Sequence, residues 1–108
     1  MRIIAEALFR KELKRLTKKY PSIPTDYANL LQSLQDNPQQ GTPLGSNAYK
    51  VRMFIGSKKT GKSGGARVIM YVRIERETIR LLTIYDKADM ESISDAMLKQ
   101  LINDIVED

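Results

Sequence analysis

The spacing of apolar residues changes once along the chain, near residue 48, and this change limits the possible folds more than any other feature. Before it, apolar side chains recur at helical spacing; after it, they alternate, as in strands with one buried face. With 108 residues, 42% of them hydrophobic, the chain can bury one core without disulfides or a structural metal. We therefore expect a single α+β domain spanning residues 1–108.

Two helices are predicted ahead of the sheet, after a short apolar segment at residues 2–7 that fits an edge strand. The first helix ends at Pro21, because proline cannot continue it. Ser22 is the predicted cap of the second helix, which stops at Asn37-Pro38. The apolar stripes are Leu8, Phe9, Leu13 and Leu16 in the first helix and Tyr27, Leu30, Leu31 and Leu34 in the second.

Three strands are predicted from the alternating part of the chain. They cover residues 48–55, 66–74 and 78–85, and the last is apolar on both faces, as an inner strand should be. Residues 39–47 have the composition of a surface loop. A closing helix within residues 94–106 completes the order β-α-α-β-β-β-α, a small twisted antiparallel sheet of three to four strands with two N-terminal helices and a C-terminal one. That helix has Ser94 as its cap and Met97, Leu98, Leu101, Ile102 and Ile105 on its apolar side.

Positive charge is concentrated in the first 85 residues. That part has 16 Lys and Arg against 6 Asp and Glu, whereas residues 86–108 have 2 against 7. Two blocks, residues 1–19 and 50–80, hold most of the cations. Such blocks are typical of proteins that bind a polyanion, but basic residues that merely solvate a helix and a sheet give the same composition. The position of these cations on the folded helices and strands distinguishes between the two interpretations.

The absence of Cys and His excludes several kinds of chemistry. There can be no cysteine nucleophile, no Ser-His-Asp triad, no histidine base and no Cys/His zinc site. Acid–base catalysis must therefore use Lys, Arg, Tyr, Asp or Glu. Residues 1–20 mix acidic and basic side chains without a long apolar run, so we expect neither a signal peptide nor a membrane anchor, and a cytoplasmic protein.

Residues 56–63 match the G-x-x-x-x-G-K-[ST] pattern of a phosphate-binding P-loop letter by letter. That motif needs a helix directly after the loop, because the loop amides and the helix N-terminus hold the phosphates together. Here two glycines and a strand pattern follow instead. We expect a Gly- and Lys-rich connection between two strands, whose Lys58, Lys59 and Lys62 can contact phosphates, and no nucleotide site.

A basic surface interleaved with aromatic residues is predicted on one face of the sheet. Lys50 and Arg52 lie two apart on one strand and so share a face, which Arg67 on the next strand joins if the register allows. Cations neutralise phosphates and aromatic rings stack on bases, so this combination suits single-stranded RNA. A plain solvated sheet face is the alternative. Further members of the predicted surface are Tyr71, Arg73, Tyr85 and Lys87.

Several segments occur together in one order along the chain: the spacing from Phe9 to Pro21, Asn37-Pro38, Tyr49-Lys50-Val51-Arg52, residues 61–69, and Ile84-Tyr85-Asp86-Lys87. In this combination they resemble the RelE/ParE superfamily of toxins, and most of all its RelE/HigB-like branch. The resemblance covers nearly the whole chain and implies a small twisted antiparallel sheet with two N-terminal helices and a C-terminal one, in agreement with the predicted order.

The resemblance also implies an activity. Toxins of this branch are ribosome-dependent endoribonucleases that cut mRNA in the ribosomal A site, with no metal or other cofactor. The 2′-hydroxyl of the message attacks the adjacent phosphodiester, which leaves a 2′,3′-cyclic phosphate on one fragment and a 5′-hydroxyl on the other. Cations of the protein stabilise the extra negative charge of the transition state.

Matched by position, Lys50 becomes the general base, Arg52 the phosphate clamp and Arg67 the residue that stabilises the transition state. Lys87 corresponds to one member of a basic pair in the family.

Two positions depart from the family. The second member of the basic pair is Ala88, and a family tyrosine that can stack on a base falls at Ser94. These departures leave the identity of the acid that protonates the leaving group undecided. Tyr85 either takes that role or belongs to the core.

The partners that the resemblance implies are the ribosome with its mRNA and a cognate antitoxin protein. No membrane contact and no direct reading of operator DNA by this chain are expected. Two alternatives remain: a ParE-like inhibitor of DNA gyrase, whose branch typically lacks the cation set, and an inactive RNA-binding module of the same fold. The basic first helix is expected to contact ribosomal RNA through Lys11, Lys14, Arg15 and Lys18.

Overall fold

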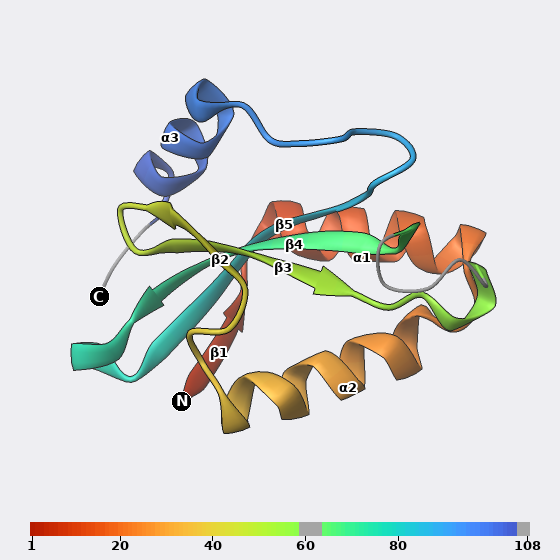
Figure 1. Ribbon diagram of the computed structural model, residues 1–108, viewed down its shortest axis with the longest axis horizontal. Helices are drawn as coiled ribbons and strands as arrows, with labels where there is room; N and C mark the ends of the chain where they lie inside the picture. Colours follow the sequence, from red (N-terminus) through yellow and green to blue (C-terminus); the bar gives the residue numbers. More distant parts are fainter. Residues whose placement is uncertain (59–63, 106–108) are drawn as a thin grey trace.

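A five-stranded sheet with helices on both faces forms the molecule (Figure 1). The computed structural model describes residues 1–58 and 64–105. The strand order is β1-β5-β4-β3-β2; α1 and α2 pack on one face of the sheet and α3 on the other. The strands are β1 (Arg2–Ala5), β2 (Thr42–Gly45), β3 (Ala48–Met53), β4 (Ala66–Arg73) and β5 (Thr78–Asp86), and the helices are α1 (Ala7–Lys19), α2 (Ile23–Asp36) and α3 (Asp95–Asn103).

The α+β class and the placement of the helices are confirmed, and β5 is the inner strand that its apolar composition predicted. Every residue of β5 is buried, because α1 and α2 cover one of its faces and α3 the other. On one side β5 pairs antiparallel with β4, and on the other it pairs parallel with β1, where Arg2 lies opposite Thr78. The first and last strands of the chain are therefore neighbours.

The expectation of a loop over residues 39–47 is wrong in part, because β2 forms within it as an additional edge strand. Gly45 pairs with Ala48, so Ser46 and Asn47 make a two-residue hairpin turn. Both have positive φ, 52° and 65°, as a type I′ turn requires. Pro43 fits such a strand only because β2 is at the edge, where a missing N–H costs no ladder bond.

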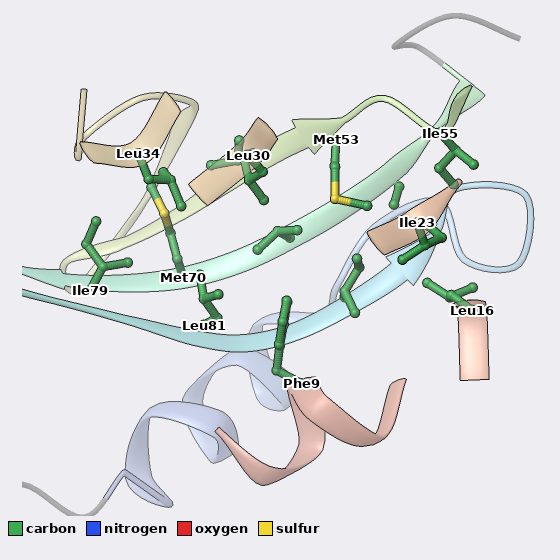
Figure 2. Packing of buried hydrophobic residues seen from close by; sticks show 14 of the residues in the cluster. Phe9, Leu16, Ile23, Leu30, Leu34, Met53, Ile55, Met70, Ile79 and Leu81 are labelled. Carbon is green, nitrogen blue, oxygen red and sulfur yellow. The ribbon is translucent and has the colours of Figure 1, made fainter. Parts of the chain in front are cut away.

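The larger hydrophobic core lies between the sheet and the α1–α2 layer (Figure 2). Phe9 of α1 and Leu34 of α2 are fully buried there against strand residues such as Met70 and Leu81. The Phe9 ring also meets that of Tyr27, with 5.6 Å between ring centres. The helical stripes thus face the sheet as predicted, except that Leu8 is 41% exposed.

A smaller cluster lies under α3, where Ile69, Leu82 and Tyr85 pack against Leu98. Ser94 caps this helix as predicted, since its hydroxyl accepts a hydrogen bond from the Met97 amide at 3.1 Å.

Two details of the helix predictions are wrong. The Met97 side chain is 46% exposed instead of packed, because α3 is short and rests on the sheet mainly through Leu98. Ser22 stands at the start of α2, but its hydroxyl does not cap the helix: it donates to Asp26 Oδ2 at 2.7 Å and accepts from the Ser57 amide at 2.8 Å. Ser22 therefore ties α2 to the short 3-10 turn η1 (Gly56–Lys58).

A bulge in β5 decides which face its last residues occupy. Ile69 pairs with Thr83 and Met70 with Leu81, so Leu82 between them has no partner on β4. A bulge of this kind shifts the alternation by one residue. Consequently Leu81 and Ile84 both face the α1–α2 core, while Tyr85 turns toward α3.

Gly65 marks a close approach of β3 to the start of β4, and it yields a stability prediction. A Cβ at Gly65 would lie 2.3 Å from the Met53 carbonyl oxygen, whereas a Cβ at Gly56 would meet nothing closer than 3.4 Å. Gly65→Ala is therefore expected to lower the free energy of unfolding by about 1–3 kcal/mol, measured by urea denaturation, and Gly56→Ala to change it far less. Equal losses in the two variants would contradict the close approach.

Candidate functional site

Four predicted cations surround one hollow on the α3 face of the sheet. Lys50 and Arg52 come from β3, Arg67 from β4 and Lys87 from the segment after β5. The hollow has a volume of about 420 Å³ and is open to solvent. Its remaining lining residues are Thr42, Glu91 and Ser92.

The strand register explains why the cations converge. Arg52 lies directly opposite Arg67 in the β3–β4 ladder, and Lys50, two residues earlier, points to the same face. Their neighbours Val51 and Val68 point into the core. Like charges directly opposite each other destabilise a sheet, so this pair departs from what stability alone would favour. Such departures are expected at sites that bind a counter-charged ligand.

Arg67 is the most enclosed of the four cations, with 3% of its surface exposed. It sits in a row across the sheet, with Arg52 on one side and Tyr85 on the other. One guanidinium nitrogen donates to the Ala66 carbonyl oxygen at 3.1 Å, which helps to hold the side chain in place. A guanidinium in the wall of the hollow is a planar donor group, the geometry that phosphate oxygens accept best.

Tyr85 does not line the hollow. It is 5% exposed, and its buried hydroxyl makes no hydrogen bond with the described residues. Burial raises the pKa of this hydroxyl, and the nearby Arg67 guanidinium lowers it by a smaller amount. The structure therefore places Tyr85 among the core residues under α3, beside Arg67 but away from solvent.

A buried carboxylate, Asp86, organises the end of β5 behind the hollow. Its two oxygens accept hydrogen bonds from Tyr20 Oη at 2.6 Å, Lys58 Nζ at 2.5 Å and the Ala88 amide at 3.0 Å. Burial alone would raise the pKa of Asp86, but these three donors outweigh it and hold the pKa below its ordinary value. Asp86 thus ties α1 and η1 to the segment that carries Lys87.

Of the other residues predicted to bind RNA, those that the structure describes do not share one surface with the hollow. Lys58 is held in the ion pair with Asp86 and has little exposure. Tyr71 and Arg73 lie toward the far end of β4; Arg73 is six residues, about 20 Å, from Arg67, and its guanidinium contacts the Tyr71 ring. Lys59 and Lys62 lie outside the described residues. The cations of α1, all exposed, lie on the layer across the sheet from the hollow: Lys11, Lys14, Arg15 and Lys18.

Sequence reasoning missed three lining residues: Thr42, Glu91 and Ser92. Thr42 was assigned to a loop, and its pairing with Lys50 brings it to the hollow. Glu91 and Ser92 follow β5 in an irregular segment, where no periodicity indicates direction. The only available signal was their short distance along the chain from Lys87.

The P-loop pattern gains no support. Its first residues form the 3-10 turn η1, and β4 begins at Ala66, which leaves no room for the helix that such a loop requires. Within residues 1–58 and 64–105, no group of three or more His, Cys, Asp or Glu side chains is placed to hold a metal ion. In the same part of the chain, no helix has the length and apolar character needed to cross a membrane.

The folded chain is similar to solved structures of the E. coli toxin RelE. A mutant of that toxin in the free state aligns over 97% of this chain and 97% of its own, with a TM-score of 0.63. The isolated RelE toxin aligns over 96% and 98%, with a TM-score of 0.60. This chain has the RelE fold. Sequence identity is 12% in both comparisons, and no family model matches the sequence.

The RelE fold confirms the architecture that the resemblance implied, here with the additional strand β2 at one edge. At 12% identity the likeness concerns the path of the backbone. The side chains that line the hollow of this RelE-fold chain must be judged on their own chemistry. Four cations around an open hollow can hold an anion with several oxygens, and a phosphodiester is such an anion.

The Asp86 cluster predicts an acid-sensitive stability. Because its pKa is lowered in the folded chain, Asp86 contributes stability that is present above its ordinary pKa of 3.8 and is lost as the pH falls through the lowered value. Asp86→Asn is expected to lower the free energy of unfolding at pH 7 by about 1–3 kcal/mol, because it leaves Lys58 without its counter-charge. The same variant should lose less stability than the parent between pH 5 and pH 3.

Asp89→Asn is the matched control, since Asp89 is exposed and only three residues away. Urea unfolding followed at several pH values measures both variants. Two variants with the same stability and the same pH dependence would contradict the role given to Asp86.

Proposed function

We propose that this protein is the toxin of a toxin–antitoxin system and acts as an endoribonuclease that cuts mRNA in the ribosomal A site. The observation that carries the proposal is the convergence of Lys50, Arg52, Arg67 and Lys87 on one open hollow. The RelE fold supports it, because the similar solved structures are those of a toxin. A plain solvated sheet face would not place Arg52 against an almost fully buried Arg67.

The proposed reaction needs only RNA and protein side chains. The 2′-oxygen loses its proton to Lys50, the general base, and bonds to the adjacent phosphorus, while the bond from phosphorus to the 5′-oxygen breaks. Lys87 donates a proton to the departing 5′-oxygen. The products are a 2′,3′-cyclic phosphate and a 5′-hydroxyl, and no oxidant or metal is consumed. Lys87 replaces Tyr85 as the acid in this scheme, because Tyr85 is buried and Lys87 lines the hollow.

Arg52 and Arg67 are proposed to stabilise the negative charge of the transition state. In the transition state the oxygens around phosphorus carry more negative charge than those of the starting diester. Fixed guanidinium groups therefore stabilise the transition state more than the substrate. Arg67, held by the sheet and the Ala66 carbonyl, requires little reorganisation during the reaction. Arg52 is exposed and can close on the phosphate after RNA has entered.

The charge distribution supports the proposed partners, which are the ribosome with its mRNA and an antitoxin. The exposed cations of α1, on the layer across the sheet from the hollow, are placed to contact ribosomal RNA while the hollow holds the message. An antitoxin would inhibit by covering the cationic hollow. Both partners place the protein in the cytoplasm, where translation takes place.

The first test is mapping of 5′ ends on a message in a purified translation system. Arg52→Ala is expected to lower the cleavage rate by about 100- to 1,000-fold, and Lys50→Ala by a similar factor, because each removes a group that acts on the transition state. Lys99→Ala is the matched control: it removes one exposed cation from α3, outside the hollow, and should leave the rate unchanged.

Cuts that require ribosomes and vanish in the Arg52 and Lys50 variants would support the proposal. Folded parent protein that yields no cuts, or hollow variants that cut as fast as the Lys99 variant, would contradict it. Inhibition of gyrase supercoiling by the same preparation would then favour the ParE-like alternative.

Substitution of Glu91, unlike that of the cations, is expected to strengthen RNA binding. Its carboxylate is the one acidic group among the residues described as lining the hollow, and it opposes the binding of a phosphate there. Glu91→Gln is expected to lower the Kd for a short single-stranded RNA by about 2- to 5-fold at low salt, and by less at high salt. Fluorescence anisotropy measures it. Weaker binding in Glu91→Gln would show that the carboxylate contacts a donor on the RNA instead.

A further inference from the structure

A second, smaller pocket lies beside the cationic hollow, between α2 and the edge of β3. Its volume is about 150 Å³. Arg52 lines both this pocket and the hollow, so the two lie on either side of this one residue at the edge of β3. The other lining residues are Asp26, Asn29, Leu30, Ser33, Gln40, Met53 and Phe54.

Phe54 is the most conspicuous of these residues. It follows Lys50 and Arg52 at two-residue spacing beyond the end of β3, and 44% of it is exposed. The chain has only two phenylalanines, and the other, Phe9, is fully buried. The exposed part of the ring is available to a ligand, and covering it would remove apolar surface from water. Arg52 and Phe54 line the same pocket, which puts the ring within one nucleotide's reach of a phosphate held by Arg52.

The polar residues of the pocket can bind the edge of a flat ring. Asp26 Oδ2 already accepts from Ser22 and from the Gly56 amide, which leaves Oδ1 able to accept a further N–H. Asn29 is exposed and brings an amide with both donor and acceptor atoms. Nucleobases carry N–H donors and lone-pair acceptors along one edge and apolar faces above and below.

The volume limits what can enter. A cavity of about 150 Å³ accommodates one benzene-sized ring, which is much less than a helix or a whole nucleotide needs. An aromatic platform, a hydrogen-bonding edge and a neighbouring phosphate-binding cation together match one base of a bound strand.

We propose that this pocket is a nucleobase subsite: Phe54 stacks on one base of the RNA whose phosphate is held by Arg52, and Asn29 and Asp26 bind the edge of that base. The inference rests on the proposed function for its ligand, since it takes the bound polyanion to be single-stranded RNA. It adds a contact that positions the strand and gives the site a means to distinguish bases.

The test is an abasic scan in the absence of ribosomes. A short dye-labelled single-stranded RNA, with 2′-deoxy sugars that block cleavage, is made in versions that each lack one base. Wild-type protein at low salt should bind one of these versions about 5- to 100-fold more weakly than the intact strand, the range expected for a lost stacking contact. In Phe54→Leu that difference should disappear, and in Phe54→Tyr, which keeps the aromatic face, it should remain.

Ile74→Leu is the control, because Ile74 is a similarly exposed apolar residue, at 47%, outside both pockets. It should bind every strand as the wild type does. Equal affinity of the wild type for all abasic versions, or an abasic penalty that persists unchanged in Phe54→Leu, would overturn the subsite. Loss of the abasic penalty in Ile74→Leu would also overturn the subsite, because the effect would then not be specific to Phe54.

The binding experiment and the cleavage assay test the two proposals independently, so failure of one proposal can be distinguished from failure of the other. A protein that binds RNA in a Phe54-dependent way but produces no A-site cuts keeps the subsite and loses the proposed endoribonuclease activity. A protein that cuts in the A site but shows no Phe54-dependent base contact keeps the activity and loses the subsite. Tight binding of an aromatic peptide that is insensitive to added RNA would assign the pocket to a protein partner and overturn the proposal.

Discussion

The pairing of β4 with β5, interrupted by the bulge at Leu82, determines the rest of the site. Because the bulge shifts the alternation, Tyr85 packs under α3 beside Arg67, and Asp86 turns toward the ends of α1 and η1. Without it, these two side chains would exchange faces. A carboxylate would then lie next to Arg67 and neutralise the hollow, and the phenol would face the larger core. One unpaired residue thus keeps the acid behind the cations instead of among them.

Charge separation across the sheet explains how so basic a hollow is compatible with folding. The Arg52–Arg67 pair is unfavourable in itself, and the Asp86 cluster stabilises the same end of the sheet from the opposite face. Lys58 contributes there through its ion pair and not as a ligand for RNA. The protein therefore keeps the Lys58–Asp86 ion pair on one face of the sheet and the cationic hollow on the other.

Periodicity predicted the fold and the centre of the site, because it reports which residues share a face. Lys50 and Arg52 fell on one face by spacing alone, and the true register then brought Arg67 opposite Arg52. Features that depend on long-range contacts were not predictable. The strand β2 needs its partner β3, the Leu82 bulge looks like any apolar strand residue, and the burial of Tyr85 depends on where α3 docks. Glu91 and Ser92 lie in an irregular segment whose direction no sequence pattern encodes.

The parallel pairing of β1 with β5 has a consequence for how the chain acquires its structure. Arg2 finds its partner only at Thr78, 76 residues later in the chain, and the buried central strand continues to Asp86. Contacts so distant along the chain close late and slow folding. The two N-terminal helices can form early, but α1 has its main partner in the sheet only once β5 has been synthesised. The cationic hollow, which needs Lys87 and the segment beyond it, is therefore assembled only after β5 has joined the sheet.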